Sequence, residues 1–121
     1  MKTLLLIALL ASPALADDPP KAFTAYPGSR QLCYQHISGN PMHIMWSSHA
    51  TKDTFAKVLA HYEKGLGKKA RSDANGAKTI EVDAQRRVTI YPRASEAKLP
   101  KCETKPSAGE QTLVMISTSS K

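Results

Sequence analysis

One segment of the chain has a pattern that only a helix satisfies, and the rest of the fold has to be built around it. In the stretch ATKDTFAKVLAHYEKGLGKK, large apolar residues recur at spacings of three and four positions: Phe55, Val58, Leu59, Tyr62 and Leu66. These spacings place the side chains on one face of an α-helix. Thr51 or Asp53 can cap its start, and Gly65 or Gly67 can end it. A helix with one apolar face has to bury that face against another layer.

Segments that alternate polar and apolar residues on both sides of this helix predict β-strands. Before the helix we expect one strand over about Arg30–Ser38 and a second over about Met42–Ser48, joined by a Gly-Asn-Pro turn. After the helix we expect a hairpin of Lys78–Asp83 with Arg86–Arg93, and a last strand over Gln111–Ser117. The predicted fold is therefore a two-layer α+β fold. Its antiparallel sheet has about five strands in the order β-β-α-β-β-β, and one helix covers one face.

The N-terminal sequence MKTLLLIALLASPALA has the features of a secretory signal peptide: a basic residue, a short apolar run and a small-residue end. We expect cleavage after Ala16, an extended lead-in over residues 17–29 and a single domain over residues 30–121. No other apolar stretch approaches the roughly 20 residues of a transmembrane helix. No cysteine stands at the cleavage point and no Asn-x-Ser/Thr site is present, which favours a soluble bacterial protein of the periplasm or the medium.

The sequence contains two cysteines, Cys33 and Cys102. In an oxidising compartment an even pair predicts one disulfide, and no Cys-x-x-Cys spacing indicates a redox site. This bridge would tie the first strand to the segment that leads into the last one.

Basic residues exceed acidic ones, and loss of Lys2 with the signal peptide would change the formal net charge from +7 to +6. Such a surplus favours anionic partners, for example an envelope polymer or lipid headgroups, and is also a common aid to solubility. The candidate contacts form two groups on different elements: Arg87, Tyr91 and Arg93 on a predicted strand, and Lys64 and Lys68 on the helix.

Acidic residues across the predicted hairpin offer a different explanation for the strand group. We expect Asp83 to lie opposite Arg87 and Glu81 opposite Thr89, which would neutralise part of the charge. A solvated sheet face accounts for the same residues without a ligand, and nucleic acid is not an expected partner.

The stretch PMHIMWSSH concentrates two methionines, two histidines and the only tryptophan of the chain. Alternation along a strand places Met42, Ile44 and Trp46 on one face, which we expect to point to the core. The other face then carries His43, Met45 and His49.

A metal site is one interpretation of this stretch. If the turn sets His36 opposite His43, with Tyr34 facing Met45, the candidate ligands are His36, His43, Met45 and His49. Imidazole and thioether donors together suit copper, particularly Cu(I). Methionine is also a common filler of gaps in cores, and a register slip of one residue would disperse the cluster. A copper site and a core strand both remain open at this point.

Patterns typical of enzymes are absent from the sequence. There is no Gly-x-Ser-x-Gly segment and no reactive cysteine, and the acidic residues are scattered singly. The six glycines form no phosphate-binding loop. We therefore expect no catalysis.

Two short motifs carry a resemblance to known proteins. YPGS at Tyr26–Ser29 precedes the first strand pair, and the helix has the pattern V-x-x-x-Y-x-x-x-L at Val58, Tyr62 and Leu66. In these motifs the chain resembles small exported bacterial α+β domains in which a Y-P-G segment precedes a helix with the pattern V-x-x-F/Y-Y-x-x-x-L. The resemblance spans about half of the chain that follows the signal peptide. It implies the fold and no catalytic residue.

These observations lead to one functional expectation and one alternative. We expect a small exported, non-catalytic binding or interaction module without a cofactor, whose partner is an anionic envelope component or a protein. The alternative is a periplasmic copper-binding protein that uses the histidines and Met45 of the first two strands.

Overall fold

The structure is a computed structural model that describes residues 20–39, 41–98, 102 and 104–120. Its elements follow one another as β1 (Arg30–Ser38), β2 (His43–Thr51), α1 (Phe55–Leu66), β3 (Arg71–Ser72), η3 (Ala74–Gly76), β4 (Lys78–Glu81), β5 (Arg86–Pro92), η4 (Arg93–Lys98) and β6 (Thr112–Ser120), where η marks a short 3₁₀ helix. One sheet and one α-helix make up the fold, which confirms the expected α+β class. No helix in the described part of the chain is long and apolar enough to cross a membrane.

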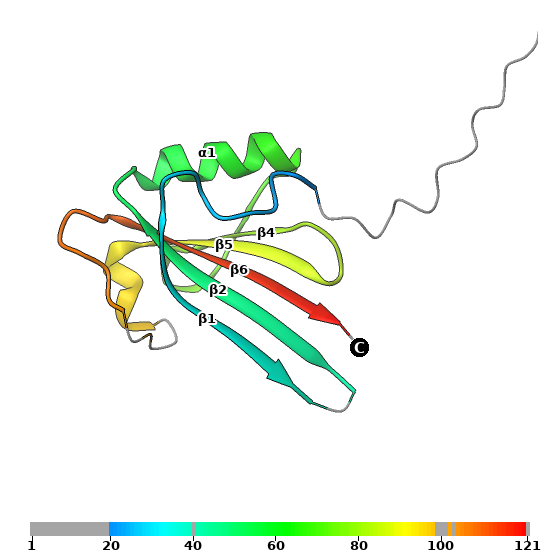
Figure 1. Cartoon of the computed structure of the whole chain (residues 1–121). Coiled ribbons are helices and arrows are strands. Elements are labelled where there is room, and N and C mark those ends of the chain that lie inside the picture. Colours follow the sequence, from blue (N-terminus) through cyan, green and yellow to red (C-terminus); the bar gives the residue numbers. More distant parts are fainter. Residues whose placement is uncertain (1–19, 40, 99–101, 103, 121) are drawn as a thin grey trace, which may run out of the picture.

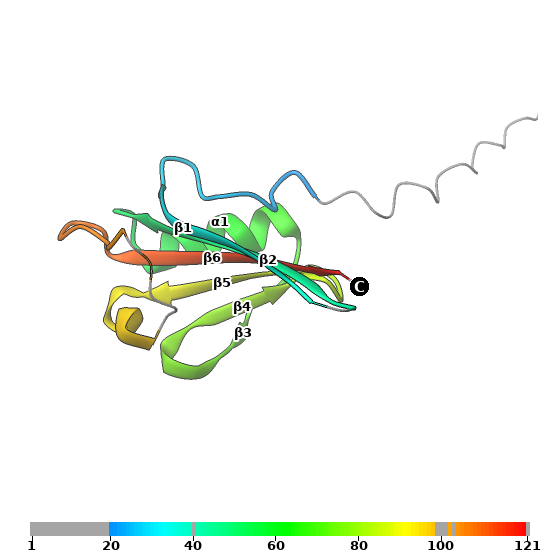
Figure 2. The same ribbon diagram turned by 60° about the horizontal axis from the view of Figure 1, so that its bottom comes forward.

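The six strands form a single antiparallel sheet in the order β1-β2-β6-β5-β4-β3 (Figures 1 and 2). The expected count of five strands was wrong because β3 is only two residues long, too short to show an alternating pattern. It pairs with β4 at Arg71 opposite Thr79 and Ser72 opposite Lys78. The last strand in the sequence, β6, lies in the middle of the sheet between β2 and β5.

Helix α1 covers one face of the sheet and forms the main core with it (Figure 1). The fully buried residues there are Val58 and Tyr62 from the helix and Ile80, Val88, Ile90 and Val114 from the strands. The helix begins after Thr54, whose hydroxyl accepts a hydrogen bond from the Lys57 N–H, so the expected caps Thr51 and Asp53 were wrong by a few residues. Gly67, with φ of +67°, ends it as expected.

The described part of the lead-in, residues 20–29, packs on the same side of the sheet as α1 and contains no regular element (Figure 1). Tyr26 is buried in the main core and its hydroxyl donates to the Asp53 carboxylate at 2.5 Å. The Tyr62 hydroxyl donates to the Thr24 carbonyl oxygen at 2.7 Å. These two bonds hold the segment against the helix.

The opposite face of the sheet carries a smaller core near the disulfide. Leu32, Ala50 and Leu113 are buried there, and Tyr91 and Cys102 pack against them. The expected disulfide between Cys33 and Cys102 is confirmed; the two residues are 69 positions apart in the sequence and their Cα atoms are 5.4 Å apart. It joins β1 to the segment before β6, on the face that the helix does not cover.

The register of the β4–β5 hairpin differs from the expected one by two residues. Glu81 pairs with Arg87 and Thr79 with Thr89. The hairpin turn is longer than expected because the Asp83 carboxylate accepts hydrogen bonds from the N–H groups of Gln85 and Arg86 and occupies the turn itself.

Candidate functional site

The hairpin formed by β1 and β2 differs in composition from the rest of the molecule. Between Gln31 and Thr51 there is no Asp, Glu, Lys or Arg, although these residues make up 22% of the chain. The large hydrophobic side chains that are exposed in the described residues all lie here: Tyr34 (56%), Ile37 (50%), Met42 (43%) and Met45 (40%). Exposed apolar residues gathered in one place mark an interaction site more often than scattered ones do.

The expected register between β1 and β2 was wrong. The observed register determines which histidines lie near one another. His36 lies opposite Met45, and Ser38 lies opposite His43. The expected pairing of His36 with His43 is off by two residues because the Gly39 N–H bonds the Met42 carbonyl oxygen at 2.7 Å and closes the turn there. A shift of two residues preserves the face on which each side chain lies, so the residues remain on one face.

His36, His43 and Met45 form a compact exposed group near the tip of the hairpin. Met45 is directly across the ladder from His36, and His43 is a diagonal neighbour. The two imidazole rings lie with their centres 5.9 Å apart and their planes at 37°. All three side chains are exposed to solvent. We call His36, His43 and Met45 the hairpin cluster.

The face that carries the hairpin cluster is the one that α1 covers elsewhere. Ser47 of β2 pairs with Ile116, which packs against the main core, so the odd-numbered residues of β2 share the side of the helix. The helix lies over β4 and β5, while the tip of the hairpin extends away from it (Figure 1). The hairpin cluster therefore faces solvent.

The expected core face of the second strand was wrong. Met42 is 43% exposed, and Ile44 and Trp46 are only half-buried, because they lie toward the hairpin tip on the face that α1 does not cover. Burial instead increases along β2 away from the tip, where Ser48, Ala50 and Thr51 are buried.

His49, the fourth expected ligand, lies in this buried half of β2 and is only 5% exposed. Its Nε2 atom is 2.8 Å from the Ser47 hydroxyl oxygen, and burial lowers the pKa of its imidazole. It lies four positions after Met45, which corresponds to about 13 Å along a strand. The structure does not bring His49 to the hairpin cluster.

The three candidate partner-binding residues of β5 and η4 have different surroundings. Arg93 donates through Nη1 to the carbonyl oxygens of Ser107 and Glu110, both at 2.7 Å. Tyr91 is half-buried against Leu113. Arg87 is exposed opposite Glu81.

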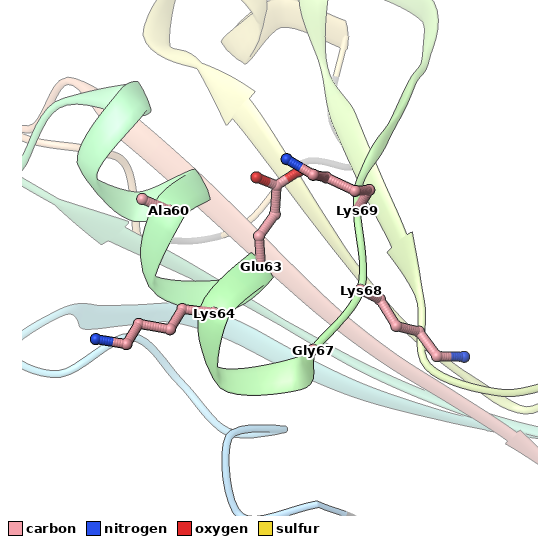
Figure 3. Close-up of a pocket in the computed structure, with 6 residues that line it drawn as sticks. All are labelled: Ala60, Glu63, Lys64, Gly67, Lys68 and Lys69. Atoms are coloured by element: carbon pink, nitrogen blue, oxygen red, sulfur yellow. The ribbon is translucent and has the colours of Figure 1, made fainter.

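Lys64 and Lys68 line a shallow surface pocket of about 370 Å³ at the C-terminal end of α1. The lining residues are Ala60, Glu63, Lys64, Gly67, Lys68 and Lys69 (Figure 3). Figure 3 shows the ammonium groups of Lys64 and Lys68 pointing in opposite directions. Lys68 donates to the carbonyl oxygens of Glu81 and Val82, and the Glu63 carboxylate lies within the pocket wall. A carboxylate at this position opposes the binding of an anion.

No group of three or more His, Cys, Asp or Glu side chains that could hold a metal ion occurs in the described ranges. The hairpin cluster has two imidazoles, and its third donor is a thioether. A metal ion bound here could not be held by histidine, thiolate and carboxylate ligands alone. The thioether of Met45 would favour a soft ion.

Comparison of the chain with protein-family models, with curated proteins and with solved structures gave no match in any of the three. The resemblance to small exported bacterial domains therefore stays a prediction. The sequence did contain one further signal, the 21-residue segment without a charged side chain, that pointed to the hairpin as a site.

Proposed function

We propose that this protein is a small exported binding module without catalysis of its own, and that it binds copper as Cu(I) through His36, His43 and Met45. The observation that carries the proposal is the exposure of Met45. A methionine that fills a gap in a core is buried, whereas this one is 40% exposed and pairs across the ladder with His36. A thioether beside two imidazoles is a soft donor set.

The spacing of the two histidine rings supports this ligand. A first-row metal ion bonded to one nitrogen of each ring at about 2.0 Å would place the ring centres roughly 5 to 6 Å apart. The observed distance is 5.9 Å. A metal ion held between the two rings would take the Met45 sulfur as its third ligand, because Met45 lies opposite His36 on the same face.

The basic residues support an anionic partner less well than the hairpin cluster supports a metal. They lie on separate elements, and Arg93 and Lys68 donate to backbone carbonyl oxygens. The earlier expectation of an anionic envelope partner therefore ranks below Cu(I) binding.

The test is a competition between the disulfide-bonded chain of residues 17–121 and a Cu(I) chelator of known affinity, under anaerobic conditions. We expect one Cu(I) per chain, with NMR shifts confined to the imidazoles of His36 and His43 and the methyl group of Met45. Met45→Leu preserves the volume of the side chain and removes the sulfur, so affinity should fall by about tenfold or more. Met42→Leu, on the same hairpin but outside the cluster, is the matched control and should bind like the wild type.

Three outcomes would contradict the proposal. One is no binding in competition with the chelator. Another is equal loss of affinity in Met45→Leu and Met42→Leu. The third is saturation at several equivalents, which would indicate nonspecific binding to exposed donors.

Export is a separate part of the proposal and rests on residues 1–16. The disulfide is compatible with an oxidising compartment. Expression of the full chain in a bacterial host should yield a periplasmic or secreted protein that begins at Asp17. Recovery of the uncleaved chain from the cytoplasm alone would contradict this part and leave the metal test unaffected.

A further inference from the structure

Strand β1 is at one edge of the sheet, and its outer side faces no other strand of the described chain (Figures 1 and 2). An edge strand presents unpaired N–H and C=O groups that can pair with a further strand. Which residues present them follows from the bond that closes the hairpin.

The Gly39 N–H bonds the Met42 carbonyl oxygen, so residues 39 and 42 form a hydrogen-bonded pair. Hydrogen-bonded and non-bonded pairs alternate along an antiparallel ladder. Counting back from Gly39, the odd-numbered residues of β1 bond to β2. The backbone groups of the even-numbered residues Tyr34, His36 and Ser38 therefore point outward, away from the sheet.

This edge lacks most of the features that usually block strand addition. Natural edge strands are short, carry charged residues or proline, or are bent by bulges. The opposite edge of this sheet, β3, has two residues, one of them the charged Arg71. Strand β1 has nine residues, and after the irregularity between Gln31 and Cys33 it contains neither proline nor a formally charged residue.

We infer that a second copy of this chain pairs with β1 in an antiparallel manner, so that two sheets join into one. The pair is related by a twofold axis perpendicular to the sheet, which places both copies of α1 on the same face. The register centred on His36 satisfies all the outward groups, because Tyr34 then pairs with Ser38 of the second copy, and Ser38 with its Tyr34. The inference goes beyond the proposed metal binding and does not require a metal ion.

The distribution of charge favours this face over the others as the place where two copies meet. With a net charge of +6 on each mature chain, most surfaces would bring like charges together. Residues 31–51 of the hairpin contain no Lys, Arg, Asp or Glu, and Arg30 at the start of β1 is paired with Glu110, so two copies can meet here without bringing unpaired formal charges together. Exposed Tyr34 and Ile37 would gain cross-strand neighbours in the pair.

The association is expected to be weak. A pair held along one short edge buries less than the roughly 1,200 Å² of stable interfaces. Dimers should therefore form progressively between about 10 µM and about 1 mM, which corresponds to a dissociation constant of that order.

Amide hydrogen exchange followed by NMR at low and high protein concentration tests this inference on the disulfide-bonded chain with a metal chelator present. In the monomer, the amides of Tyr34, His36 and Ser38 face solvent and exchange fast, whereas those of Gln35 and Ile37 are bonded to β2. At about 1 mM protein we expect exchange of the first three to slow roughly fivefold for a dissociation constant of about 0.1 mM, with Gln35 and Ile37 little changed. Sedimentation analysis should show the dimer over the same range.

Ser38→Pro provides a variant that removes one outward N–H from each copy and leaves the bonds between β1 and β2 in place. It should shift association to at least tenfold higher concentration, while Ser38→Ala, which retains the N–H, should not. A chain that stays monomeric at all concentrations would overturn the inference, and so would a dimer whose protection does not alternate along β1. Because the exchange measurement uses the wild-type chain, the test stands even if Ser38→Pro does not fold. A chain that dimerises but binds no Cu(I) would refute the proposed function alone.

Discussion

Replacement of Glu110 by Gln tests the main polar contact between the two ends of the folded chain. The Glu110 carboxylate is buried and accepts from Arg30 Nη2 at 2.7 Å and from Arg30 Nε at 3.2 Å. It also accepts from the Ser107 N–H at 2.7 Å. The contact joins the first residue of β1 to the turn before β6, 80 positions away in the sequence.

The size of the effect follows from what Glu110→Gln removes. The amide oxygen can still accept one bond, but the charge and the two-pronged contact with the guanidinium are lost. Hydrogen bonds to a charged group contribute about 1.5 to 3 kcal/mol, against about 0.5 to 1.5 kcal/mol for neutral ones. Because the Arg30 side chain is 41% exposed and screened by solvent, we take the lower part of the difference, about 1 kcal/mol. For a domain of this size that corresponds to about 4 to 8 °C in Tm.

The dependence on pH separates lost charge from lost packing. The hydrogen bonds from Arg30, together with that from the Ser107 N–H, lower the pKa of Glu110 below its usual range. A carboxyl group with a lowered pKa in the folded state stabilises the protein above the pKa of the unfolded state, and this contribution is lost as the pH falls through the folded-state pKa. The wild type should therefore exceed Glu110→Gln in stability at neutral pH, and the two should converge in acid.

The assay is urea unfolding of both proteins at about pH 7 and at successively lower pH to about pH 2.5, below the usual carboxyl range. Other acidic groups with a lowered pKa, such as Asp73, Glu81 and Asp83, are present in both proteins and cancel in the comparison. A difference of the same size at every pH would refute the reasoning, because it would assign the loss to packing. No difference at neutral pH would show that solvent screens the contact completely.

Two further predictions concern the lead-in and the disulfide. A Cβ at Gly65 would lie 2.7 Å from the Ala22 Cβ. Gly65→Ala should therefore cost about 1 kcal/mol or more in net stability, although alanine has the better helix propensity. It should also expose the Thr24 amide to hydrogen exchange, because this amide bonds the Ala22 carbonyl oxygen. Gly67→Ala meets no atom within 4 Å but has φ of +67°, so it should cost about 1 kcal/mol and leave the Thr24 amide unaffected; identical exchange in both variants would contradict this. Replacing both cysteines with Ser should lower the free energy of unfolding by about 2 to 5 kcal/mol in urea titrations, and an unchanged midpoint would argue against a stabilising bridge.

The parts of the fold that were predicted correctly are those that local sequence determines. The helix was predicted because its apolar spacing repeats over three turns, and β1 because its bounds coincide with an alternating run. The disulfide followed from the presence of two cysteines. Each of these signals is contained in a short segment or a simple count.

The parts that were missed depend on residues far apart in the sequence. Strand β3 exists because Arg71 and Ser72 pair with β4, and the Arg71 guanidinium bonds the Glu81 carboxylate at 2.9 Å. Alternation along β2 indicated which residues share a face, but not which part of the strand would be covered. Which part of β2 is buried depends on the positions of α1 and the lead-in. It also depends on β6, which lies beside β2 in the sheet although it comes last in the sequence.

The hairpin cluster was predicted in part for the same reason. The faces were right because an error of two residues in register preserves them, which placed His36, His43 and Met45 together. His49 was wrongly grouped with them because alternation ignores distance along the strand. Its burial could not be predicted, since it depends on Val114 of the distant strand β6, which lies opposite.

The two proposals for the hairpin share only His36 and use different groups of the chain, and this makes them separable. Metal binding uses side chains that project from one face of the sheet, whereas pairing of two copies uses backbone groups at its edge. Met45→Leu should therefore abolish high-affinity Cu(I) binding and leave sedimentation unchanged, because Met45 is on β2 and not at the edge. Ser38→Pro should weaken the dimer and retain Cu(I) binding by the monomer. If one variant removed both properties, metal binding and dimer formation would be a single linked process, and the hairpin would act as a metal-bridged interface between copies.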